Sequence, residues 1–150
     1  MSESHPDSHP VVRAFLQGGG KPHAMTEPLA ALMKGEILRI DAAEGVAELA
    51  FSPDERFVQG AGVLQGGIVT SMLDFSMALA AFSRLEPHRS LGTVSLSVHF
   101  LKAALPGRHT VRARLDRMGG SMAFASAELF RDGAEGPIGT GTAVMALTRK

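Results

Sequence analysis

The chain has 150 residues, the size of one ordinary domain, and its 45% hydrophobic content supports a packed core and argues against wholesale disorder. Its 15 basic and 15 acidic residues give a formal net charge of zero, and no basic stripe indicates binding to nucleic acid. Because the chain has no cysteine, it can form no disulfide framework, thiolate metal site or thiol nucleophile.

The N-terminal part of the sequence predicts a tail and two short helices. Residues 1–10 are polar and proline-containing, which predicts a disordered tail before a single domain over residues 11–150. This polar, acidic start is unlike a secretory signal, so we expect a cytoplasmic protein that does not associate with a membrane. Val11–Leu16 and Pro28–Met33 predict the two helices, the second with Thr26 as a possible N-cap.

The rest of the chain predicts a sheet wrapped around one helix. Gly35–Ala42 and Val46–Phe51 flank a turn and predict a hairpin, and Ile68 to about Leu85 predicts one long helix. Four further strands are expected over Thr93–Leu101, Thr110–Met118, Ser121–Phe130 and Ile138–Thr148. In the first of these, Val94, Leu96, Val98 and Phe100 alternate on one face. This order of elements predicts an α+β fold with an antiparallel sheet of five to six strands.

The long helix carries an isolated charge. Between Arg56 and Arg84, Asp74 is the only formally charged residue. A carboxylate on a helix that is apolar all round costs several kcal/mol unless something compensates it. Asp74 therefore lies on a solvent-facing stripe, makes a structural hydrogen bond, or is a general base or nucleophile in a pocket. The residues that share its helix face are Gly67, Thr70, Ser71, Met77 and Ala78.

Two glycines mark the expected start of this helix. Free backbone N–H groups at Gly66 and Gly67, together with the helix dipole, would favour a developing negative oxygen. A glycine also lets a substrate carbonyl approach the backbone closely. A plain turn from loop to helix is the alternative explanation of the pair.

One run of the sequence resembles the signature of hotdog-fold thioesterases of the phenylacetate-pathway and hydroxybenzoyl-CoA type. That signature is Asn-x-x-Gly-x-x-His-Gly-Gly, followed by Asp or Glu within the helix. This chain reads Gln59-x-x-Gly62-x-x-Gln65-Gly66-Gly67, followed by Asp74. The resemblance covers roughly residues 35–148 and is most specific over 59–74.

The resemblance implies an acyl-CoA thioesterase with a hotdog fold, built as a homodimer or a dimer of dimers. The Gly66 N–H and Gln59 would stabilise the oxyanion. Asp74, reaching in from the other subunit, would activate water or attack the thioester carbon. Thr93 would lie near that water. No metal or redox cofactor is implied, because coenzyme A enters only as part of the substrate, and the six histidines suggest no metal cluster.

The substrate side of the site is expected around Gln65, Gly67, Arg117 and Ser121. The last two flank the Gly119-Gly120 turn, near which related enzymes bind coenzyme A; a solvated hairpin is the alternative. Apolar acyl or aryl groups are suggested by Leu64, Met72, Phe75 and Met77.

Two departures from the signature bear on the chemistry. Gln59 replaces Asn, although a Gln amide can still donate to a carbonyl. Gln65 replaces His, which removes any acid–base role there, so we expect this position to be structural. Two other functions stay open: a hotdog hydratase or dehydratase, which would usually pair a His with the acid, and a non-catalytic acyl-CoA binding or sensing module.

Overall fold

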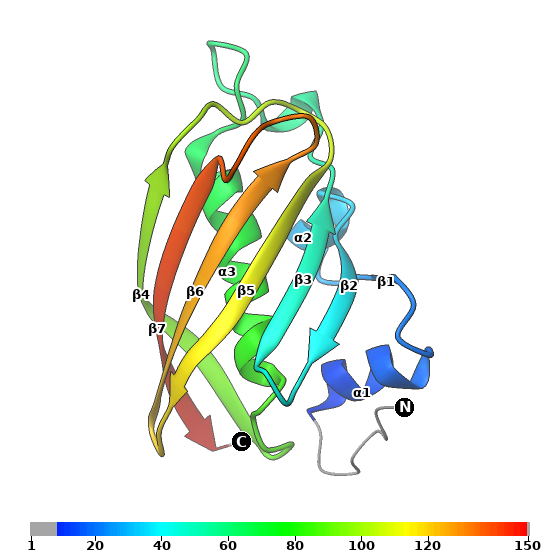
Figure 1. Ribbon diagram of the computed structural model, residues 1–150, viewed down its shortest axis with the longest axis vertical. Helices are drawn as coiled ribbons and strands as arrows, with labels where there is room; N and C mark the ends of the chain where they lie inside the picture. The colour runs from blue at the N-terminus through cyan, green and yellow to red at the C-terminus, as the bar shows by residue number, and fades with distance from the viewer. Residues whose placement is uncertain (1–8, 150) are drawn as a thin grey trace.

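The computed structural model describes residues 9–149 and shows one antiparallel sheet wrapped around a long helix, α3 (Gly66–Phe82), which runs behind the strands in Figure 1. The described residues form seven strands in the order β1-β2-β3-β5-β6-β7-β4. The strands are β1 (His23–Ala24), β2 (Glu36–Asp41), β3 (Val46–Phe51), β4 (Arg89–Phe100), β5 (His109–Met118), β6 (Met122–Arg131) and β7 (Gly139–Arg149).

The predicted α+β architecture is confirmed. Every predicted strand is present, and the two-residue β1, which no alternation of side chains announces, is added at one edge. The long helix begins at Gly66 rather than Ile68, and it ends at Phe82 rather than near Leu85. Both glycines of the signature therefore belong to the first turn of α3.

The short helices are also confirmed, with corrected ends. They are α1 (Pro10–Gln17) and α2 (Pro28–Leu32). The N-cap of α2 is Glu27 and not Thr26, and it makes no side-chain capping bond. The expected disordered tail lies outside the described residues except for His9 and Pro10, which are the N-cap and the first residue of α1. No helix in residues 9–149 is long and apolar enough to cross a membrane.

Small residues on the inner face of the sheet allow α3 to approach the strands closely. A Cβ atom added to Gly141 would lie 3.3 Å from Met77 Cε and 3.5 Å from Leu73 Cδ1. Both of these α3 side chains are fully buried. The neighbouring positions that face the helix are also small, namely Ala125, Ala127 and Ala143. Close packing of its side chains against the sheet therefore fixes the position of α3.

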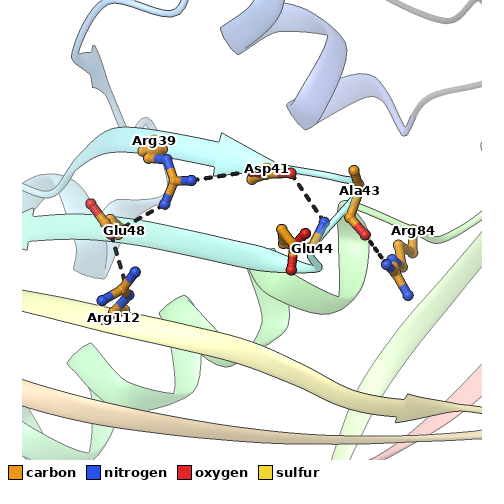
Figure 2. Close-up of polar contacts among 7 residues, drawn as sticks. All are labelled: Arg39, Asp41, Ala43, Glu44, Glu48, Arg84 and Arg112. Carbon is orange, nitrogen blue, oxygen red and sulfur yellow. Dashed lines mark hydrogen bonds and ion pairs between the residues drawn. The ribbon is translucent and has the colours of Figure 1, made fainter. Parts of the chain in front are cut away.

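Arg84 joins the end of α3 to the β2–β3 turn (Figure 2). Its Nε donates to the Ala42 carbonyl at 2.9 Å, and its Nη2 donates to the Ala43 carbonyl. The Asp41 carboxylate accepts the Glu44 N–H at 3.0 Å and closes the same turn. These bonds hold the hairpin against the C-terminal end of the helix.

Strand β4 departs from the alternation read in the sequence. Its pairing with β7 shifts register between Thr93 and Ser95, so Val94 lies in a β-bulge. Val94 is 63% exposed and Phe100 is 58% exposed, so the alternating face does not point into the core of the chain. The prediction that this face is uniform was wrong because a bulge resets the alternation and because β4 is an edge strand, with no described strand beyond it.

His109 is a fully buried titratable group at the start of β5. Its Nδ1 lies 2.8 Å from the Gly107 carbonyl, so Nδ1–H donates and Nε2 is the basic nitrogen. Nε2 is buried and has no hydrogen-bond partner. Burial lowers the pKa of His109 from its usual value of 6.5, and the charge of Arg131 lowers it further, against opposing effects of the Gly107 bond and Asp132.

We predict that stability falls in mild acid through this side chain. Because the folded pKa of His109 is depressed, stability is full above about pH 6.5, the unfolded value, and declines as the pH falls below it. The urea midpoint of the wild type should drop more between pH 7.5 and 5.5 than that of His109→Gln. His23→Gln, an exposed control, should behave as wild type. Equal losses in wild type and His109→Gln would show that His109 is not the group responsible.

Candidate active site

Asp74 lies on the side of α3 that faces the β4 edge. It is half-buried, and so are Ser71 and Ala78, which lie one turn before and after it on the same face. The helix is therefore not buried on all sides, although its apolar sequence suggested that it would be. One stripe stays open, and the carboxylate keeps partial access to solvent, which lowers the cost of its charge.

The hydroxyl of Thr93 holds the Asp74 carboxylate. Thr93 Oγ1 donates to Asp74 Oδ1 at 2.8 Å, and the bulge that follows Thr93 interrupts the ladder between β4 and β7 at this point. Asp74 Oδ2 forms no hydrogen bond with any residue from 9 to 149. One carboxylate oxygen is thus fixed, and the other can accept a proton or contact an electrophilic carbon.

The first turn of α3 offers a second polar group. Gln65 is the N-cap and makes no side-chain capping bond, and the Gly66 N–H forms no hydrogen bond with a described residue. A Cβ at Gly66 would lie 3.3 Å from Phe100 Cζ, whereas a Cβ at Gly67 would meet nothing within 4 Å. The free N–H and the helix dipole make this turn a suitable place for an oxyanion.

Gln59 lies on the loop between η1 (Glu55–Phe57) and α3, which projects beyond the end of the sheet in Figure 1. Its Oε1 accepts the Ala61 N–H at 2.8 Å, and its carbonyl accepts the Gly62 N–H at 3.0 Å. The Gln65 N–H donates to the Phe57 carbonyl at 2.9 Å and anchors the loop to the helix start. The side-chain oxygen of Gln59 is occupied within its own turn, and its NH2 group remains available as a donor.

The structure separates the remaining predicted residues from this center. Arg117 is an exposed residue near the end of β5, and Ser121 is exposed in the β5–β6 turn. Arg89, at the start of β4, donates from Nη2 to the Gly120 carbonyl at 2.7 Å and ties this turn to the β4 edge. No contact joins Arg117 or Ser121 to Asp74 within the described chain.

A groove opens directly beside Asp74 and Thr93, with a volume of about 390 Å³. Of the residues expected to contact the substrate, Phe75 lines it. Leu64, Met72 and Met77 were wrongly expected there, because they are 4%, 0% and 0% exposed and belong to the core between α3 and the sheet.

Within one chain, the acid and the helix start cannot act on the same bond. Gly66 and Asp74 are eight residues apart in α3, which is about 12 Å along the helix axis. An oxyanion donor must lie about 3 Å from the carbonyl oxygen, and a base must reach a water beside the same carbon. A site that used both groups on one thioester would therefore need the helix start of another copy.

Comparison with known proteins places this geometry in a family. The model of the thioesterase superfamily matches residues 61–137, which include Gly66, Asp74 and Thr93. A Pseudomonas aeruginosa protein described as an esterase is 34% identical over 113 residues, which cover 74% of this chain and 83% of that protein. The chain belongs to the thioesterase superfamily. It is a thioester hydrolase with a hotdog fold.

Two solved structures of superfamily members resemble this one over nearly their whole length. A Ralstonia eutropha protein described as a phenylacetic acid degradation-related thioesterase is 29% identical, with a TM-score of 0.78 over 89% of this chain and 97% of that one. A thioesterase family protein from Silicibacter pomeroyi is 30% identical, with a TM-score of 0.77 over 93% and 96%. The suspected resemblance to hotdog thioesterases is thereby confirmed.

The sequence patterns did not indicate the roles of three side chains, two of them near the candidate site and one at the β5–β6 turn. Phe100 packs on Gly66, Arg89 fixes the turn at Gly120, and Phe82 lines the groove. Phe100 was assigned only to an alternating face. Arg89 and Phe82 carry no local signal, because their partners are distant in the sequence.

We predict that the Thr93 hydroxyl positions Asp74 for hydrolysis. Thr93→Val removes the donor but keeps the side-chain volume, so kcat should fall about tenfold, or about 1.4 kcal/mol in barrier, with little change in KM. Thr93→Ser, which keeps the hydroxyl, should restore most of the rate. Ser126→Ala provides a matched control, because Ser126 Oγ donates to Asp116 on the outer sheet face at 3.1 Å. A Thr93→Val enzyme with normal kcat would exclude this positioning role.

Proposed function

We propose that this protein hydrolyses the thioester of an apolar acyl- or aryl-CoA. The observation that carries the proposal is Asp74, the one charge of α3, held by Thr93 at 2.8 Å beside an apolar groove. A groove of this kind accepts an acyl group, and the fixed carboxylate can act on its thioester carbon. The name of the Ralstonia relative makes arylacetyl-CoA a suitable first substrate.

In the proposed reaction, a water molecule attacks the thioester carbon and Asp74 takes its proton. The Gly66 N–H of the second copy donates to the carbonyl oxygen as negative charge develops on it. The C–S bond then breaks, and the proton passes to the coenzyme A thiolate, so the products are a carboxylic acid and a thiol. Direct attack by Asp74, followed by hydrolysis of the anhydride, uses the same groups and stays open.

Gln59 and Gln65 take supporting roles in this proposal. The free NH2 group of Gln59 can donate to the carbonyl oxygen beside Gly66. Gln65 holds the helix start through its backbone, while Gly67 leaves open space for the approaching thioester. Arg117 and Ser121, at the β5–β6 turn, are proposed to meet the coenzyme A part of the substrate, and no metal or redox cofactor takes part.

We predict that Asp74→Asn lowers kcat at least a hundredfold with a smaller change in KM, because a positioned base contributes about 10²–10⁴-fold. The amide keeps the shape and can still contact Thr93, so the thermal melt should stay close to wild type. Asp116→Asn is the matched control, since Asp116 also accepts a hydroxyl hydrogen bond but lies on the outer sheet face. Kinetics on a panel of acyl-CoAs provide the measurement.

The outcomes of that experiment separate the candidate functions. Near-normal turnover in folded Asp74→Asn would return Asp74 to a structural role. Tight binding of acyl-CoA by the wild type without release of thiol would favour the binding or sensing module instead.

We propose that the second copy pairs along β4. This edge strand is unpaired on one side within the described chain and exposes Val94 and Phe100 at 63% and 58%; Leu101, just after its end, is 54% exposed. Thr93, beside Asp74, lies near the middle of the strand, and Phe100, beside Gly66, is its last residue. Antiparallel pairing about a two-fold axis midway between these two residues would bring the acid of one copy towards the helix start of the other.

The assembly can be tested with cysteines, because the natural chain has none. We predict that Leu96→Cys or Ser97→Cys, near the proposed axis, forms a covalent dimer on mild oxidation, since directly paired Cα atoms lie at about 4.5–5.5 Å. Glu44→Cys, on the distant β2–β3 turn, should not. Light scattering should show a dimer or a dimer of dimers. A fully active monomer at assay concentration would contradict the two-copy site.

A further inference from the structure

The groove beside Asp74 is built from three separate parts of the chain. Helix α3 and strand β4 form two of its sides, and the third comes from the N-terminal segment, residues 9–27. The apolar side chains that line it include Val11, Met25, Phe75, Phe82 and Leu91. Its volume of about 390 Å³ lies at the small end of the range for ligand pockets, so it suits a compact group.

The N-terminal side of the groove is firmly anchored. Val12 and Phe15 of α1 are 0% and 3% exposed, and the His9 ring packs against Phe82 in a tilted arrangement with centroids 4.1 Å apart. The Met25 N–H donates to the Gly35 carbonyl at 2.8 Å. The groove is therefore a formed feature of the fold, and a ligand need not order this segment first.

Among Asp, Glu, Lys and Arg, only carboxylates line the groove, together with the His9 ring. Two carboxylates, Asp74 and Glu27, line it, and no Lys or Arg side chain does. Glu27 makes no capping bond at the start of α2 and no ion pair with a described residue, so its charge is not neutralised locally. A carboxylate at the end of the acyl group would be repelled by these two groove carboxylates, whereas a neutral apolar group would not.

Ala78 sets the width of the groove beside the acid. It lies one turn after Asp74 on the same helix face and is half-buried. A longer side chain at this position would project into the space between α3 and the N-terminal segment.

We propose that the N-terminal segment is the specificity wall of the active site, and that this wall selects neutral, apolar acyl groups of aryl or medium-chain size and rejects acyl groups that end in a carboxylate. The inference rests on the proposed acyl-CoA hydrolysis and adds to it the residues that choose the acyl group. Phe75 and Phe82 of α3 would contact the acyl group. Met25 of the wall and Ala78 of α3 would together limit its size, and Glu27 of the wall would set its charge.

Size selection is tested with acetyl-, hexanoyl- and phenylacetyl-CoA. Ala78→Leu should lower kcat/KM at least tenfold for the two larger substrates and leave acetyl-CoA within about threefold. Met25→Ala, on the N-terminal segment, should shift preference towards longer chains. Ala14→Leu is the matched control, because Ala14 is an exposed α1 residue outside the groove, and it should match wild type. Thermal melts confirm folding. Equal effects of Ala78→Leu on all three substrates, with none from Met25→Ala, would overturn the size assignment.

Charge selection is tested with hexanoyl-CoA against adipoyl-CoA, which have the same chain length and differ in a terminal carboxylate. The wild type should prefer hexanoyl-CoA, and Glu27→Gln should reduce that preference about fivefold, the factor expected for one like-charge contact in a water-exposed site. Glu44→Gln, a distant exposed acid, should leave the preference unchanged. An unchanged preference in Glu27→Gln would remove Glu27 from the wall.

Different results would contradict the proposed hydrolysis and the proposed specificity wall. If wild type releases no thiol from any acyl-CoA, the proposed function itself fails. If wild type hydrolyses the substrates but the groove variants keep its selectivity, acyl-CoA hydrolysis stands and the specificity wall is wrong.

Discussion

The packing of α3 against the inner face of the sheet fixes the geometry of the whole site. Gly141 and the alanines of β6 and β7 let the helix lie close to the strands, and Leu73 and Met77 fill the space between them without exposure to solvent. Because Gly66 and Asp74 are both on this rigid helix, their separation of about 12 Å is set by helix geometry. The fold therefore holds both polar groups of the proposed site on one helix but keeps them apart within one chain.

Strand β4 contacts both of these separated helix positions. Its bulge at Val94 interrupts the ladder next to Thr93, whose hydroxyl fixes Asp74, and its far end places Phe100 against Gly66. An edge strand that exposes apolar side chains is costly in an isolated chain. The proposed symmetric pairing would cover these side chains and would also complete two sites, so it would serve both stability and catalysis.

Sequence periodicity correctly predicted which side chains are buried on strands that pack against the core of the same chain. In β5, Val111, Ala113 and Leu115 are buried while Arg112 and Arg114 are exposed, as their alternation indicates. The same rule failed on β4, because Val94 and Phe100 are exposed on an edge strand. Burial on such a strand depends on what lies beyond the chain, and one sequence does not contain that information.

The candidate site likewise contains residues that the sequence indicated and contacts that it did not. Asp74 stood out because a lone charge in an apolar segment is expensive, and its hydroxyl partner was reachable only through the family resemblance. Segments far apart in the chain are joined by the ring contact of His9 with Phe82, by the approach of Phe100 to Gly66, and by the groove residues Val11 and Met25. Such contacts leave no local pattern, because packing between distant segments creates them.

In the proposed mechanism, chemistry and selectivity belong to different parts of the molecule. Gly66, Asp74 and Thr93 lie within residues 61–137, the segment matched by the superfamily, whereas Met25 and Glu27 lie before it. If the acid and the helix start meet the thioester as proposed, a change to either would alter the reaction for every substrate. A change in the proposed N-terminal wall would alter only contacts with the acyl group, which are remote from the bond that breaks. Binding energy from such remote contacts can be varied without disturbing the reacting atoms, so one reaction can be combined with different choices of acyl group.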